Sequence, residues 1–219
     1  MLCENEKLIM ELYGVQYHEK GSKEVIESRE DDLYSFKCYI GDHTISVEKG
    51  DSVILIENDS IVKWLRGPLN VNSEKFGLVL RGYSPENKTS ELNIKTTLPY
   101  VNGCSTRQIF PPERLGDPTV QFLEIPAYTK EQAHHIHSTA RVVYVLKGRG
   151  KSIVGMEQKH VIEELTEGKV VILDKMSPHH FETEGEPLMV IPIHIFSSVG
   201  ALESNHPMFN GTHMLNQGL

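Results

Sequence analysis

The sequence predicts a mostly β protein whose strands close into a barrel or a sandwich. Short apolar runs, each about as long as one strand, recur along the chain and are rich in β-branched residues. Clusters of Gly, Asp, Asn, Pro and Glu separate these runs, and helical periodicity is weak. Many short strands create many unpaired edges, and a closed barrel or a stacked sandwich protects such edges.

The predicted strands follow one another at turn-bounded intervals. They are Leu33–Ile40, Ser52–Ile56, Phe76–Leu80, Val120–Ile125, Arg141–Leu146, Lys169–Leu173 and Leu188–Ile195. A short helix is expected at Glu6–Tyr13, and a turn is expected at Pro112–Leu115.

Two segments of the chain resemble each other. Gly50–Trp64 aligns without a gap with Gly168–Glu182, so that Ile61 stands where the second copy has His179. A repeat and two unrelated glycine-bounded strands both explain this match. We therefore expect a first β unit at residues 1–83, a polar linker at 84–104, a second β unit at 105–198 and an irregular tail at 199–219.

The bulk composition excludes several classes of function. The 219 residues carry 22 basic and 30 acidic side chains, a net charge of −8, which disfavours sequence-independent nucleic-acid binding. Three scattered cysteines indicate no disulfide framework, and no apolar stretch is long enough for a membrane span. Without a basic segment ahead of an apolar one at the start of the chain, a cytoplasmic protein is expected.

Three histidines within four residues are the strongest candidate for a functional site. In extended backbone, residues i and i+2 share a face, so His135 and His137 point to one side and His134 points to the other. A third ligand for a metal is available about 40 residues later, at Pro178–Phe181. Either His179 or His180 shares the face of the first pair, and Pro178 restricts the backbone just before His179.

The order of these residues resembles that of the cupin superfamily. His135, His137, Gly148, Gly168 and His179 match, in order, the histidines and glycines of the two cupin motifs. The resemblance covers roughly residues 105–197 and implies a jelly-roll barrel, the double-stranded β-helix, with residues 1–83 as a smaller or degenerate cupin-like unit. It also implies a metal held by His135, His137 and His179.

The chain departs from the cupin motifs at three places. Arg141 stands where the usual glutamate ligand is expected, Lys175–Pro178 replaces Pro-x-Gly, and Thr183 replaces the usual Asn. Without the glutamate, three neutral imidazoles leave a divalent metal with its full charge of +2. In this respect the chain is similar to the three-histidine cupin dioxygenases.

The resemblance implies an enzyme, most directly a non-haem Fe(II) dioxygenase acting on a small, anionic, chelating substrate. Three ligands on one face of octahedral iron leave three neighbouring positions for substrate and dioxygen. Two alternatives stay open: an isomerase or lyase using Zn, Ni or Mn, and a binding module without catalysis. Because cupins often form dimers, the resemblance also implies a homodimer.

Three further residues are candidates for substrate binding. Arg141 can pair with a substrate carboxylate if it points into the barrel, or form an ion pair elsewhere if it does not. Tyr144 is a candidate cavity wall or a core residue, and His194 is a candidate lining residue or a buried core histidine.

Overall fold

The computed structural model describes residues 4–28, 34–92, 98–114, 116–156 and 159–196. The predicted N-terminal helix is present as α1 (Glu4–Tyr13). Within the described residues, no helix has both the length and the apolar character that crossing a membrane requires. The tail predicted at 199–219 lies outside the described residues.

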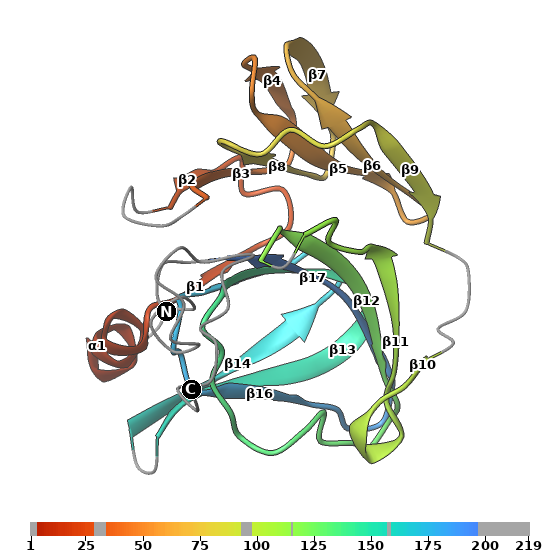
Figure 1. Cartoon of the computed structure of the whole chain (residues 1–219). Helices are drawn as coiled ribbons and strands as arrows, with labels where there is room; N and C mark the ends of the chain where they lie inside the picture. The colour runs from red at the N-terminus through yellow and green to blue at the C-terminus, as the bar shows by residue number, and fades with distance from the viewer. Residues whose placement is uncertain (1–3, 29–33, 93–97, 115, 157–158, 197–219) are drawn as a thin grey trace, which may run out of the picture.

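The strands that carry the second half of the chain form one curved antiparallel sheet (Figure 1). We call it the C-terminal unit, and its order is β1-β15-β13-β17-β12-β11-β10, with β14 and β16 also paired to β13. The strands are β1 (Val15–His18), β10 (Leu98–Pro99), β11 (Ser105–Phe110), β12 (Thr119–Ile125), β13 (Ala140–Met156), β14 (Lys159–Thr166), β15 (Val170–Leu173), β16 (His179–Glu182) and β17 (Leu188–Ile195).

The first half of the chain forms two smaller antiparallel sheets, which we call the N-terminal unit. The larger has the order β2-β3-β8-β5-β6-β9, and the smaller pairs β4 with β7. The strands are β2 (Val25–Glu27), β3 (Phe36–Ile40), β4 (His43–Val47), β5 (Ser52–Asn58), β6 (Ile61–Arg66), β7 (Leu69–Ser73), β8 (Phe76–Leu80) and β9 (Lys88–Glu91). A short 3-10 turn, Val101–Gly103, follows before β11.

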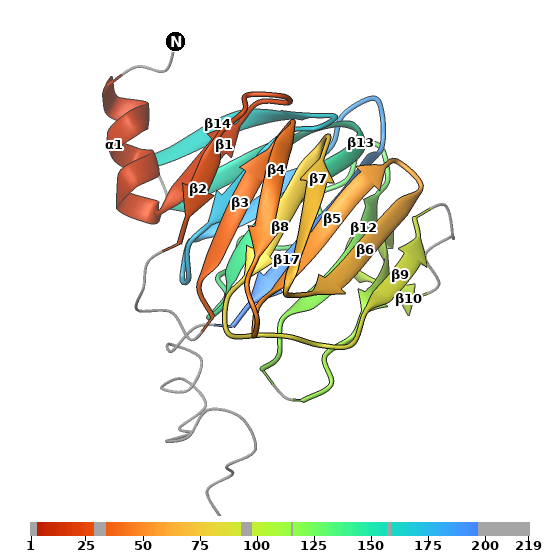
Figure 2. The same ribbon diagram turned by 90° about the horizontal axis from the view of Figure 1, so that it is seen from above.

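The two units share one hydrophobic core. Figure 2 shows β8 and β5 lying across β17 and β12, and the buried side chains between these sheets form a single cluster. Phe76 of β8 meets Tyr144 of β13 at 5.3 Å between ring centroids, and Trp64 of β6 meets Phe110 of β11 at 5.8 Å. The large sheet of each unit therefore buries one face against the other.

Strand alternation sends the remaining side chains into the interior of each unit. On β13, Val142 and Tyr144 belong to the shared core, whereas Val143 and Val145 belong to a separate cluster inside the C-terminal unit. This period of two places Arg141, the preceding odd-numbered residue, on the interior face.

Strand β13 is the longest strand and bends between its partners. Its first half pairs with β15 and β17, and its second half pairs with β14 and β16. Gly148 lies at this change with a φ of +86°, and a Cβ there would lie 1.9 Å from the carbonyl oxygen of Pro187. Only glycine fits this close approach, which explains the glycine of the motif.

Three short strands cross the boundaries that the sequence suggested. Val15–His18 pairs with β15 of the C-terminal unit, and Lys88–Glu91, inside the predicted linker, pairs with β6. Leu98–Pro99, also inside that linker, pairs with β11. The division at residues 83 and 105 stays a prediction, and the segment between them is partly structured.

Candidate metal centre

The first two histidines of the candidate site lie in the segment that leads into β13. His135 forms an isolated antiparallel bridge with His179, with N–O distances of 3.2 and 2.9 Å in the two directions. The amide of Met176 donates to the carbonyl of His137 at 2.7 Å. These backbone bonds fasten the His-x-His segment to the start of β16, although it precedes β13 rather than forming part of it.

The structure brings His135, His137 and His179 together. Their ring centroids are 4.5 Å apart for 135 and 137, 4.7 Å for 135 and 179, and 5.3 Å for 137 and 179. One nitrogen of each ring lies within 4.8 Å of the others. In the described part of the chain, these three side chains form the one group of His, Cys, Asp or Glu close enough to share a metal ion.

The hydrogen bonds of two rings fix which nitrogen is free. His135 Nδ1 lies 2.8 Å from the carbonyl oxygen of Ala133, and His179 Nδ1 lies 2.7 Å from that of Ser177. A carbonyl oxygen only accepts, so each Nδ1 must donate its proton and each Nε2 carries a lone pair. Backbone oxygens of this kind typically orient histidines that bind metals.

Two of the ring nitrogens are buried without a partner. His135 Nε2 and His137 Nε2 have no hydrogen bond within the described residues. An unsatisfied buried polar atom costs about 1–3 kcal/mol and calls for a missing partner. A metal ion among the three rings satisfies both atoms, so the side chains fit a divalent cation.

The electrostatics of the site keep the imidazoles neutral. Burial, together with the nearby Arg141 charge, lowers the pKa of His137 to about 2 and that of His179 to about 3. Burial also lowers the pKa of His135. Metal ligation requires the neutral ring, so the site is already in its ligand form near neutral pH.

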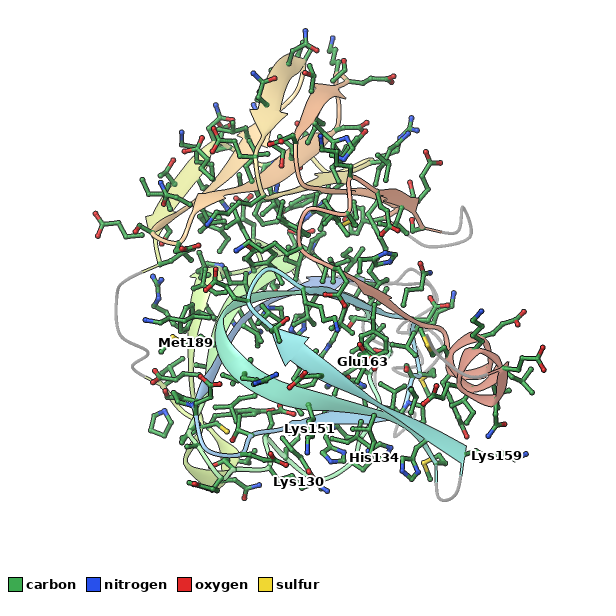
Figure 3. All side chains as sticks on the ribbon, turned by 180° about the vertical axis from the view of Figure 1, so that it is seen from behind. Lys130, His134, Lys151, Lys159, Glu163 and Met189 are labelled. Carbon is green, nitrogen blue, oxygen red and sulfur yellow. The ribbon has the colours of Figure 1, made fainter. Side chains whose placement is uncertain are left out.

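The two histidines that flank this group point elsewhere. His134 and His180 contact each other, with their Nδ1 atoms 2.7 Å apart, and His180 Nε2 lies 2.9 Å from a carboxylate oxygen of Glu182. Figure 3 shows His134 and Lys130 on the side of the C-terminal unit that faces away from the N-terminal unit. The alternation expected from sequence therefore selects His179, not His180, as the third member of the group.

Arg141 points into the C-terminal unit beside the histidines. Its Nη2 lies 3.5 Å from His194 Nδ1, at the limit of hydrogen bonding, and its Nε is buried without a partner. Burial lowers its pKa to about 10, so it still carries its charge at neutral pH. Among the described residues it has no ion pair, so a buried cation faces the interior without a bound anion.

A cavity of about 210 Å³ adjoins these groups. Arg141, His179 and His194 line one part of it, and the predicted lining role of His194 agrees with this position. A larger hollow of about 430 Å³ lies on the surface at Arg149 and Lys151, but ion pairs to Glu164 and Glu184 occupy its charges. The smaller cavity is therefore the one that offers unpaired groups to a ligand.

The structure does not bring Tyr144 into this site. Its side chain lies on the opposite face of β13 from Arg141 and packs against Phe76 in the shared core. The reason is the strand period of two, which separates residues of odd and even number on one strand.

The polar cavity residues that the sequence patterns did not predict include Glu131, Gln108 and Gln121. Glu131 is only 6% exposed, and burial raises the pKa of its carboxyl to about 7, against the lowering effect of Arg141. Gln108 and Gln121 face each other across β11 and β12 and line the same cavity. The polar residue Gln121 between apolar Val120 and Phe122 was the available sequence signal.

The chain is similar to one known protein family and to several solved structures. The family described as the cupin domain matches residues 121–195, about a third of the 219 residues. A Pseudomonas aeruginosa protein named as glyoxylate induced is similar, with a TM-score of 0.53, 11% identity and coverage of 83% of this chain and 80% of its own. A mutant of Bacillus subtilis oxalate decarboxylase has a TM-score of 0.53, 10% identity and coverage of 83% and 77%.

No curated protein matches the chain. At such low identities the likeness to the two solved structures concerns the fold alone. It agrees with the sequence expectation of an all-β jelly roll, which is confirmed.

Proposed function

We propose that this chain is a metal-dependent cupin enzyme, because residues 121–195 match the family described as the cupin domain. His135, His137 and His179 would hold one divalent metal. The observation that carries the proposal is the pair of buried nitrogens, His135 Nε2 and His137 Nε2, which have no partner within the described residues and lie beside His179.

The donor set supports a divalent first-row metal. Imidazole suits Fe, Zn, Ni and Cu, and metal–nitrogen distances are about 2.0–2.1 Å. Two nitrogens on one ion are then at most about 4.2 Å apart. The three nitrogens lie within 4.8 Å of one another, so small rotations of the rings bring them into range.

We further propose that the metal is Fe(II) and that the reaction is a dioxygenation. When bound, Fe(II) would supply adjacent open positions for a chelating substrate and dioxygen, together with the electrons that dioxygen activation requires. Three neutral ligands leave the full +2 charge in place, which favours an anionic substrate.

Arg141 supports the choice of an anionic substrate. Its guanidinium is buried, charged and without an ion pair among the described residues, and it lines the cavity next to His179. A guanidinium binds a carboxylate through two parallel hydrogen bonds, and that pairing would satisfy the unpartnered Nε. In the proposed reaction Arg141 holds the substrate carboxylate and orients it toward the histidines.

Metal analysis tests the ligand assignment. The purified chain should carry about one first-row divalent metal, and His137→Ala should lose it. His160→Ala is the matched control, because His160 is exposed on β14, and it should keep the metal. Full metal content in His137→Ala would refute the assignment.

Oxygen consumption separates the dioxygenase from the second candidate, an isomerase or lyase that uses Zn, Ni or Mn. The observation that favours the second candidate is Glu131, a buried carboxyl whose pKa is raised to about 7 and which suits proton transfer near neutral pH. Turnover with stoichiometric oxygen uptake supports the dioxygenase, whereas turnover under strict anaerobic conditions supports the isomerase or lyase.

A further inference from the structure

We propose that the substrate is a small carboxylate that also bears hydroxyl groups. In this assignment Arg141 binds the carboxylate, and Glu131 accepts a hydrogen bond from a hydroxyl group. The inference rests on the proposed function, because it places this substrate in the same cavity beside the histidines.

The state of Glu131 is the first observation. Glu131 is only 6% exposed, and it lines the cavity. Within the described residues no side chain forms a hydrogen bond or ion pair with its carboxyl, the backbone of Phe181 hydrogen-bonds to it, and the group of potential metal ligands does not include it. A buried carboxyl is costly unless its acceptor positions are filled, so a ligand that donates a further hydrogen bond would stabilise this arrangement.

Glu131 and Arg141 do not cancel each other. The two side chains attract each other, as their mutual effects on the pKa of each group indicate, yet they have no ion pair among the described residues. Two such groups that line one cavity without pairing favour a ligand with a negative end and a hydrogen-bond-donating end.

The polar residues of β11 and β12 are the second observation. Gln108 of β11 and Gln121 of β12 lie directly across from each other in the ladder, and both line the cavity. An amide both donates and accepts, which suits a hydroxyl group. Leu123, Val143 and Pro192 provide apolar surface between these polar groups, where the carbon skeleton of a ligand can pack.

The cavity volume limits the size of the substrate. The volume of about 210 Å³ is below the ~300 Å³ at which pockets for drug-sized ligands begin. Glycerate, a short carboxylate with two hydroxyl groups, belongs to this size class and serves as the probe.

Calorimetric titration of the metal-loaded full chain tests the inference without turnover. Glycerate and propionate share the carboxylate and the chain length and differ in hydroxyl groups. We expect glycerate to bind at least about tenfold more tightly than propionate. Glu131→Met, which removes the acceptor at similar size, should reduce this ratio to about twofold while the propionate affinity stays within twofold.

Control variants keep the test decisive. Glu186→Met replaces an exposed glutamate in the turn before β17 and should leave the ratio unchanged. If Glu131→Met does not fold, Gln121→Leu carries the same test from strand β12, with a smaller expected loss. Arg141→Met should weaken both ligands.

Equal affinities for glycerate and propionate in the unmodified chain would overturn the inference, and so would the failure of both to bind. Metal content is measured in the same samples. If the chain discriminates the two ligands but holds no metal, the proposed function is refuted and this inference stands. If the metal-loaded chain does not discriminate them, this inference is refuted and the proposed function stands.

Discussion

The interiors of the two units are filled in opposite ways. Between its two sheets the N-terminal unit buries an apolar cluster, namely Ile45, Val47, Val53, Leu55 and Val79, with the small hydroxyl side chain of Ser73 beside it. The interior of the C-terminal unit is apolar toward β14, but it also holds three histidines, Arg141 and Glu131 around a cavity.

The aligned segments share their pattern of strand faces. Val53 and Leu55 face the interior of the N-terminal unit, and their aligned partners Val171 and Leu173 face the interior of the C-terminal unit. Ile54 turns to the shared core, as does its aligned partner Ile172. A common pattern of strand faces can thus hold either a packed core or a reactive site, and the difference lies in single residues such as Ile61 and His179.

The largest expected effect concerns the core that joins the two units. Phe76→Ala should lower the free energy of unfolding by about 3–5 kcal/mol, because Phe76 is fully buried and packs on Tyr144. Denaturant unfolding measures this loss. If the metal content of the folded variant stays complete, the shared core supports the fold without shaping the site.

Metal binding should stabilise the C-terminal unit selectively. At about one hundred times its dissociation constant, a metal adds ~2.7 kcal/mol to the free energy of unfolding. Removing it with a chelator should lower the melting temperature of the unmodified chain and leave that of His137→Ala unchanged. An equal response in both would place the metal outside the three histidines.

The buried acid should make the stability of the metal-free chain depend on pH. The carboxyl of Glu131 has a pKa of about 7 in the fold, raised from 4.5 by burial. Between these two values the unfolded chain has lost the proton that the folded chain keeps, so stability falls as pH rises from about 4.5 to 7 and then levels off.

The size of this effect is on the order of 3 kcal/mol. Glu131→Gln cannot ionise and should be progressively more stable than the unmodified chain across that window. Urea unfolding at several pH values gives the difference, and a constant offset between the two proteins would contradict the assigned burial of this carboxyl.

The smallest effect is expected from the unpaired cation. Arg141→Met places an apolar chain of similar length where a buried charge lacks an anion, so the metal-free variant should gain about 1 kcal/mol of stability. Thermal unfolding checks the gain. A loss of stability would mean that the guanidinium supports the fold rather than serving a ligand.

The sequence was most informative where a residue pattern is local. The strand runs and the order His135, His137, Gly148, Gly168 and His179 led to the fold class, because strand period and turn glycines are written in neighbouring residues. The convergence of the histidines also followed from their spacing of two and from the single choice between His179 and His180.

The cavity itself depended on contacts that are distant in sequence. Glu131 lies outside any regular strand, and Gln108 and Gln121 become a wall only when β11 pairs with β12. The face of Tyr144 required knowing that the other half of the chain covers the outside of β13. No periodicity of one strand reveals which of its two faces a second sheet will occupy.

Strands β13 and β17 are buried on both faces, and this limits how the chain can be truncated. Cutting the chain near residue 105 would expose a contiguous apolar surface formed by Val142, Tyr144, Ile191 and Ile193. It would also remove β1 and so leave one edge of β15 unpaired. A fragment made that way should precipitate or self-associate. The histidine-bearing half of the chain therefore needs the sheet of the N-terminal unit to stay folded and in solution.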